Sequence, residues 1–297
     1  MRNVARLVIV ATAVMVVRID RPSVGGEPAE PAPFPEAVTL RVETDLFAGD
    51  SPEPVATSLT LFDSGVAWDF LEVRGGTAAD SSDESLELVE IVLQDPARER
   101  VVVIDPGRSV KTEIPLIRLE RLSVSLANWA RSSDDRLVRW AGGPDFSDGF
   151  SEEEGRIELA GPRVRYAVAL VEADSSAASS YRRFADTAIL LRALLQPGGI
   201  PPFPRLALNR RLETIGGIPA EVTLDIDSRN PLLPNSDRLR SVHKSHPQLI
   251  ASDHQRIEEA RAHMASADEI DLAAFMAASA MAAAAESGDP ADDGPSE

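Results

Sequence analysis

The residues best suited to metal or acid–base chemistry are four histidines near the C-terminal end: His243, His246, His254 and His263. Neutral imidazole is a common metal ligand, so a cluster of histidines is a candidate metal site. However, Pro247 directly follows His246, which does not suit the interior of a regular helix. The sequence also contains no His-Glu-x-x-His motif. We therefore expect surface histidines on a polar helical tail, and no metal site.

A carboxylate beside a glycine forms a second candidate. Asp63, Ser64 and Gly65 resemble the Asp-Ser-Gly signature of aspartic proteases, whose chemistry needs two aspartates that share one proton. The apolar-apolar-Gly segment that should follow downstream has only a poor match, at residues 215–217. Aspartate and glycine between two strand patterns are also typical of a tight hairpin turn, and this is the interpretation that we adopt.

A glycine-bearing loop over residues 142–154 holds a third candidate, the carboxylates of Asp145, Asp148 and Glu152. Calcium takes roughly six to eight oxygen ligands, and an acidic loop of this kind is able to supply several of them. The spacing does not match an EF-hand loop, so we expect a solvated acidic loop without a bound ion.

The sequence lacks the residues that other common kinds of catalysis and metal binding require. The chain has no cysteine, which removes thiolate nucleophiles, thiolate-bound zinc, iron–sulfur clusters and disulfides. It also has no Gly-x-Ser-x-Gly elbow, phosphate-binding loop or dinucleotide fingerprint. A Ser–His–Asp triad would need one of the C-terminal histidines. We therefore expect a protein that is not an enzyme and carries no cofactor.

Alternation of apolar and polar residues dominates the middle of the chain and predicts β-strands. Nine strands are expected, at residues 38–47, 55–62, 66–73, 86–94, 98–105, 108–114, 155–159, 163–172 and 220–227. Apolar residues at helical spacing predict helices that begin at Pro115 and near residues 176 and 203, and two more near residues 252–264 and 269–285.

The order of these elements predicts an α+β fold, because strands follow one another without the strictly alternating helices of a parallel sheet. We expect a curved, mostly antiparallel sheet, an open half-barrel of about nine strands with helices against one face. This domain would span residues 38–230. A helical tail would follow over residues 231–285, and a disordered acidic end over residues 286–297.

The N-terminal end predicts export. Arg2 and Arg6 precede an apolar run over residues 7–17, which is typical of a secretory signal and too short to span a membrane. We assign residues 1–26 to this signal-like segment and residues 27–37, with four prolines, to a linker. The formal net charge of −18 argues against binding to nucleic acid. We expect an acidic protein of the periplasm or cell envelope.

The order of motifs between residues 38 and 114 carries a family resemblance. An alternating strand leads to a hairpin that contains Val66-Ala-Trp-Asp-Phe70, and three strands follow, joined at Asp95-Pro96 and Asp105-Pro106-Gly107. This segment resembles the exported half-barrel proteins of the LolA/LppX lipoprotein-carrier type. The resemblance implies an open, curved antiparallel sheet covered by helices, with an apolar cavity for acyl chains.

The chain also departs from that family. It has a proline-rich linker where those carriers place a helix before the first strand, and it adds a long acidic helical tail. No ligand-binding residue of the family can be assigned to a position of this sequence by its motif.

Our first functional hypothesis is a lipid-binding or other apolar ligand-binding module. Val66, Trp68 and Phe70 share one strand face and would point into a cavity. The helix that carries Leu122, Leu126 and Trp129 would partly close it. The alternative is a packed core, in which these same residues contact each other.

The second hypothesis is an envelope interaction or structural protein that uses its C-terminal helices to contact a protein partner. The candidate apolar helix face for this role consists of Leu272, Ala273, Phe275, Met276, Ala280 and Met281.

Overall fold

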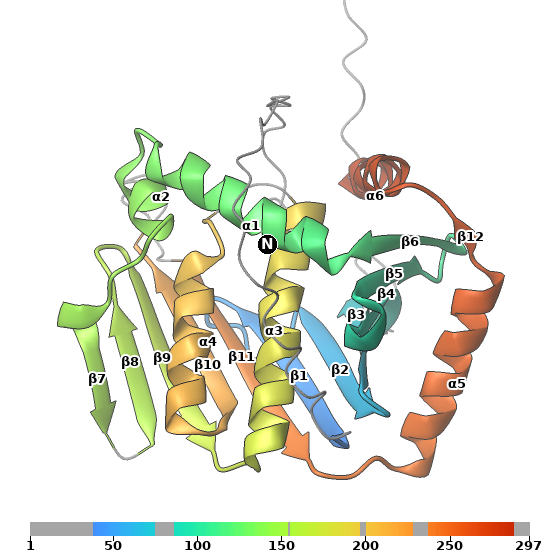
Figure 1. The fold of residues 1–297 in the computed structure, drawn as a ribbon, viewed down its shortest axis with the longest axis horizontal. Coiled ribbons are helices and arrows are strands. Elements are labelled where there is room, and N and C mark those ends of the chain that lie inside the picture. Colours follow the sequence, from blue (N-terminus) through green and yellow to red (C-terminus); the bar gives the residue numbers. More distant parts are fainter. Residues whose placement is uncertain (1–37, 75–85, 154, 197–199, 228–236, 288–297) are drawn as a thin grey trace, which may run out of the picture.

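The computed structural model describes residues 38–74, 86–153, 155–196, 200–227 and 237–287 (Figure 1). The signal-like segment, the proline-rich linker and residues 288–297 of the acidic end lie outside the described residues. Among the described residues, no helix has both the length and the apolar character that a membrane span requires.

The described residues form one sheet of twelve strands, in the order β12-β6-β5-β4-β3-β2-β1-β11-β10-β9-β8-β7. Neighbouring strands are antiparallel except β12, which pairs in parallel with β6. The strands are β1 (Leu40–Ala48), β2 (Ala56–Asp63), β3 (Val66–Arg74), β4 (Leu86–Asp95), β5 (Arg100–Asp105), β6 (Val110–Pro115), β7 (Phe150–Glu153), β8 (Arg156–Ala160), β9 (Val164–Val171), β10 (Ile218–Ile226), β11 (Asp237–His246) and β12 (Asp268–Glu269).

Six helices are described with this sheet, which makes the protein α+β with a large, open and mostly antiparallel sheet. They are α1 (Leu116–Arg131), α2 (Arg136–Ala141), α3 (Ser175–Leu195), α4 (Phe203–Ile215), α5 (Ala251–Ser266) and α6 (Leu272–Ser287). The β2–β3 connection is the tight hairpin turn that the sequence predicts, with Asp63 paired to Val66 and positive φ angles at Ser64 and Gly65.

The nine expected strands are all present, but the expected number is too low by β7, β11 and β12. The most important correction is β11, because it lies in the middle of the sheet between β1 and β10, within the region that we assigned to the helical tail. Its register pairs His243 with Thr44 and Ser241 with Leu46. The polar residues Ser241 and His243 follow Leu239 on one face of β11, so this face keeps little of the apolar alternation that would have predicted a strand.

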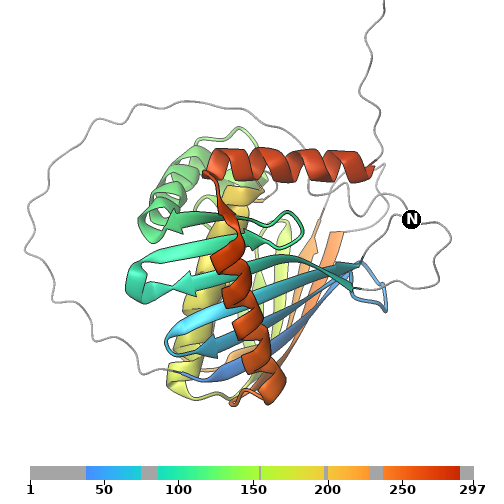
Figure 2. The same cartoon turned by 90° about the vertical axis from the view of Figure 1, so that its right-hand side faces the viewer.

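The helices cover both faces of the sheet, which corrects the expectation of one covered face. We call the side under α3 the concave face and the other side the convex face. On β4 and β5, Val92 and Val101 join a buried cluster with Leu119 of α1 and Leu191 of α3. The adjacent residues point the opposite way and contact α5. Figure 2 shows α5 lying across the strands on that side of the sheet.

Helix α5 is fixed to the convex face by apolar and ionic contacts. Ile257 is 1% exposed within a cluster that includes Trp68 and Phe70 of β3. At the start of α5, Asp253 accepts hydrogen bonds from the backbone N–H of Ile250 and, at 3.1 Å, from Nε of Arg41. These contacts hold the helix, which the sequence placed in an appended tail, against the body of the domain.

Candidate functional site

The strand residues expected in the cavity lie in the convex core instead. Trp68 and Phe70 are each only 2% exposed and contact the cluster beneath α5, and Val66 packs against the same cluster. The Arg256 guanidinium of α5 lies 4.9 Å from the centre of the Phe70 ring. These rings therefore fill a core and do not face the helices of the concave face.

The helix residues expected to close the cavity lie on the other side of the sheet. Leu122 and Leu126 are half-buried on α1, and Trp129 is 55% exposed. Because the sheet separates α1 from Trp68 and Phe70, the structure does not bring the six expected residues together. Alternation in a strand separates two faces, but it does not say which helix covers each one.

A cavity of about 380 Å³ lies between the concave face and helices α3 and α4, and we call it the inner cavity. Its walls are largely apolar, and its floor is polar. The lining residues are Thr44, Ser58, Thr60, Asp69, Tyr166, Tyr181, Phe184, Ala185, Ala188, Ile189, Arg205, Val222, Leu224, Leu239, Ser241 and His243.

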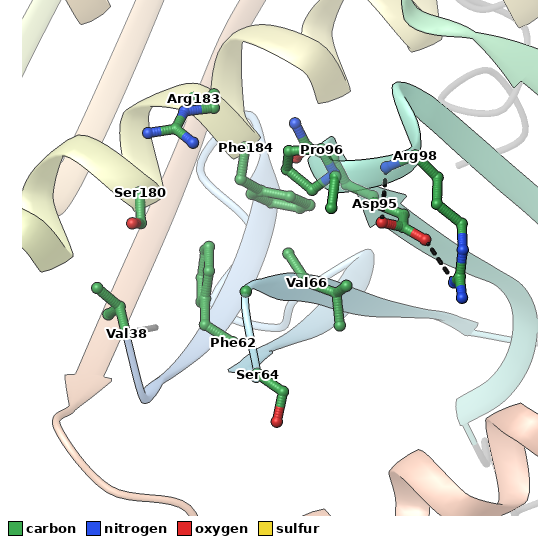
Figure 3. Close-up of a pocket in the computed structure, with 14 residues that line it drawn as sticks. Val38, Phe62, Ser64, Val66, Asp95, Pro96, Arg98, Ser180, Arg183 and Phe184 are labelled. Carbon is green, nitrogen blue, oxygen red and sulfur yellow. Dashed lines mark hydrogen bonds and ion pairs between the residues drawn. The ribbon is translucent and has the colours of Figure 1, made fainter. Parts of the chain in front are cut away.

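A second cavity, of about 500 Å³, lies where the β2–β3 hairpin and the β4–β5 connection approach α3, and we call it the outer cavity (Figure 3). Val66 is the one residue of our expected set that lines it. Phe184 of α3 lines both cavities, and its ring makes an edge-to-face contact with Phe62 at a centroid distance of 5.7 Å. Phe184 therefore stands at the boundary between the two spaces.

Asp69 forms one polar part of the inner cavity floor. It points inward from β3, on the face opposite Trp68 and Phe70, and its Oδ1 accepts hydrogen bonds from Ser58 Oγ at 2.5 Å and Thr60 Oγ1 at 2.7 Å. Burial raises the pKa of Asp69, whereas these two hydrogen bonds and the charge of Arg192 oppose that rise.

His243 forms a second polar part of the floor. Its Nδ1 lies 2.9 Å from Thr44 Oγ1, and its Nε2 lies 3.0 Å from Ser241 Oγ. Burial and the charge of Arg205 lower the pKa of His243 to about 4, so the imidazole is neutral at neutral pH. The sequence predicted that His243 lies on the surface of a helical tail, and its position in the sheet corrects this prediction. The position was missed because β11 was not recognised as a strand.

The other histidines do not join His243. Within the described ranges, no group of three His, Cys, Asp or Glu side chains is arranged as a metal site would require. His246 and His254 are exposed. In the acidic loop, the Asp145 carboxylate accepts a hydrogen bond from the backbone N–H of Ser147 at 2.9 Å.

The apolar face of the last helix is already partly occupied. Leu272 and Phe275 are 6% and 4% exposed and belong to the cluster that joins α6 to β5, β6, α1 and α3. Met276 packs against the same cluster, whereas Ala273 is exposed. The side chains of Ala280 and Met281 lie outside the described residues. The buried part of this face contacts the protein's own core.

Sequence comparisons add no family to this picture: no protein-family model matches the chain, and no curated protein matches it in sequence.

Proposed function

We propose that the protein binds a lipid or another apolar small molecule in the inner cavity. The observation that carries this proposal is the unfilled space between α3 and the concave face, which shares Phe184 in its lining with the outer cavity. The two volumes, about 380 and 500 Å³, lie within the usual range of small-molecule pockets, roughly 300–1,000 Å³.

The composition of the inner cavity supports binding of this kind. Apolar side chains from α3, β10 and β11 form its walls, including Ile189, Leu224 and Leu239. A few polar groups are gathered on the floor, as in most sites that hold and orient a small apolar ligand.

The same groups support binding over catalysis. Both ring nitrogens of His243 lie within hydrogen-bond distance of hydroxyl groups, and its pKa of about 4 makes it a weak base at neutral pH.

The proposal extends to the shape of the sheet and to the location of the protein. In it the sheet is an open half-barrel, as the resemblance to LolA/LppX-type carriers implies, and the protein acts in the periplasm or cell envelope after removal of the signal-like segment. N-terminal sequencing of the protein from the periplasmic fraction should find an end near residue 26. An intact Met1 on protein from the cytosolic fraction would contradict export.

The binding proposal is tested by filling the inner cavity. Ala188 lines it from α3, so the larger side chain of Ala188→Trp should occupy part of the ligand's space. We expect the neutral apolar dye Nile red to bind the parent protein and to lose most of its binding in this variant. The matched control is Ala262→Trp, on the exposed side of α5, which should bind the dye like the parent.

Equal binding of the dye to the parent and to a folded Ala188→Trp protein would contradict this use of the cavity. No binding to the parent would contradict a carrier role altogether, and would favour a structural module that contacts a protein partner through its C-terminal helices.

A further inference from the structure

Arg205, on the first turn of α4, lacks a partner in the inner cavity. Its side chain lines the cavity and is half-buried. Its Nε is buried without a hydrogen bond, and the guanidinium forms no hydrogen bond or ion pair with any described residue. Arginine presents up to five N–H donors and keeps its charge at all ordinary pH values, so a half-buried guanidinium without an acceptor is unfavourable.

The charge of Arg205 acts on titratable groups that line the inner cavity. Its charge lowers the pKa values of Tyr166, Tyr181 and His243. Burial nevertheless raises the pKa of Tyr166 to about 12, so its hydroxyl remains a hydrogen-bond donor. That hydroxyl forms no hydrogen bond with a described residue. Arg205 and Tyr166 thus offer unused donors to the same cavity.

The carboxylate of Asp69 does not serve as the partner of Arg205. Its electrostatic stabilisation comes from Arg192. In the sheet, β3 with Asp69 and β9 with Tyr166 are separated by five strand spacings of about 4.8 Å each. Asp69 and Tyr166 therefore lie on distant strands, and no hydrogen bond or ion pair joins Asp69 to Arg205 among the described residues.

We propose that the ligand of the inner cavity is an amphipathic monoanion, a carboxylate on an alkyl chain, whose carboxylate binds Arg205 and the Tyr166 hydroxyl. This inference rests on the proposed function and specifies its ligand class. Guanidinium and carboxylate form two parallel charge-assisted hydrogen bonds, which explains why the donors are left open in the free protein. A single cation at this end of the cavity suits a group with one negative charge.

The test compares a dansyl-labelled undecanoic acid with its methyl ester, which has the same chain but no charge. We expect the parent protein to bind the acid about tenfold or more tightly than the ester, because a charge-assisted hydrogen bond contributes at least that factor. Arg205→Met should bind both probes with the affinity of the parent for the ester. Arg205→Lys should retain part of the preference, and Tyr166→Phe should reduce it by a smaller factor.

The matched control is Arg210→Met, an exposed arginine on the same helix, which should keep the full preference for the acid. The melting temperature of the ligand-free proteins provides a second readout. Because Arg205 has no acceptor, Arg205→Met should melt at the parent's temperature or a few degrees higher.

Each outcome decides between the two proposals. Equal affinity of the parent for acid and ester overturns the anion site and leaves the apolar cavity in place. A large drop in the melting temperature of Arg205→Met would assign Arg205 a structural role and likewise overturn the anion site. Failure of both probes to bind overturns the proposed function together with this inference.

Discussion

The two faces of strand β3 differ in kind, and the difference extends across the neighbouring strands. On the convex side Trp68 and Phe70 are almost completely buried beneath α5. On the concave side Asp69 lies between them in sequence and faces the inner cavity with hydroxyl groups as its partners. On one side of the same strand the aromatic rings are buried in an apolar core, and on the other side Asp69 faces a cavity with a polar floor.

This comparison shows how the sequence keeps a cavity open. Ser58, Thr60, Ser241 and His243 occupy inward positions of central strands, where larger apolar residues would fill the space beneath α3. The close packing of α5 on the convex face stabilises the sheet from the opposite side. Part of the domain's buried core therefore lies on the convex face, so stability does not require that side chains fill the space on the concave face.

The largest expected effect is on the convex side. Trp68→Ala should leave a cavity in the cluster beneath α5 and reduce the free energy of unfolding by about 3–5 kcal/mol. Urea denaturation measures this loss. Trp68→Phe is the control, and it should cost less because it keeps most of the apolar volume and removes an Nε1–H that has no hydrogen-bond partner. Loss of ligand binding in a folded Trp68→Ala protein, without loss of stability, would reverse our assignment of the two faces.

The second effect is a pH dependence on the concave side. His243 has a pKa of about 4 in the folded protein and an ordinary value of 6.5, so the unfolded chain binds the proton first as the pH falls. Its contribution to stability is present above pH 6.5 and is lost between pH 6.5 and about 4, by at most about 3 kcal/mol. In thermal melts at several pH values, His243→Gln should lose less stability than the parent over this range. If stability fell equally with pH in the parent and in His243→Gln, the pKa of His243 would not be lowered in the folded protein.

The third effect is a smaller pH dependence of stability from Asp69, and its sign is opposite to that from His243. Burial raises the pKa of Asp69 in the folded protein, so its carboxyl group contributes stability at low pH that is lost as the pH rises through the folded value. Asp69→Asn keeps an oxygen that accepts from Ser58 and Thr60 without the buried charge. At pH 8 we expect the free energy of unfolding of this variant to exceed that of the parent by up to about 1 kcal/mol. In acid we expect this difference to disappear. If the stability of the variant relative to the parent were lower at pH 8 than in acid, this would contradict a raised pKa of Asp69.

Much of the sheet could be predicted from the sequence, but the site could not. Strands such as residues 38–47 alternate apolar and polar residues because one face contacts the core, and this signal is local. Strand β11 has no such signal, because Ser241 and His243 line a cavity with a polar floor. The pattern of β3 separates Trp68 from Asp69 but does not assign a helix to either face, so we placed the aromatic residues in the cavity. The N–H donors of Arg205 lack an acceptor because of the strands that lie beneath α4. Only the complete fold determines which strands these are.

The central claim is that the concave face holds a ligand in the inner cavity whereas the convex face does not. Native mass spectrometry of the purified protein with hexadecanoic acid tests it most directly. We predict that the parent protein and Ala262→Trp each carry one bound fatty acid, and that folded Ala188→Trp carries none. Equal occupancy of Ala188→Trp, or a parent protein that remains ligand-free at every fatty acid concentration, would contradict the account.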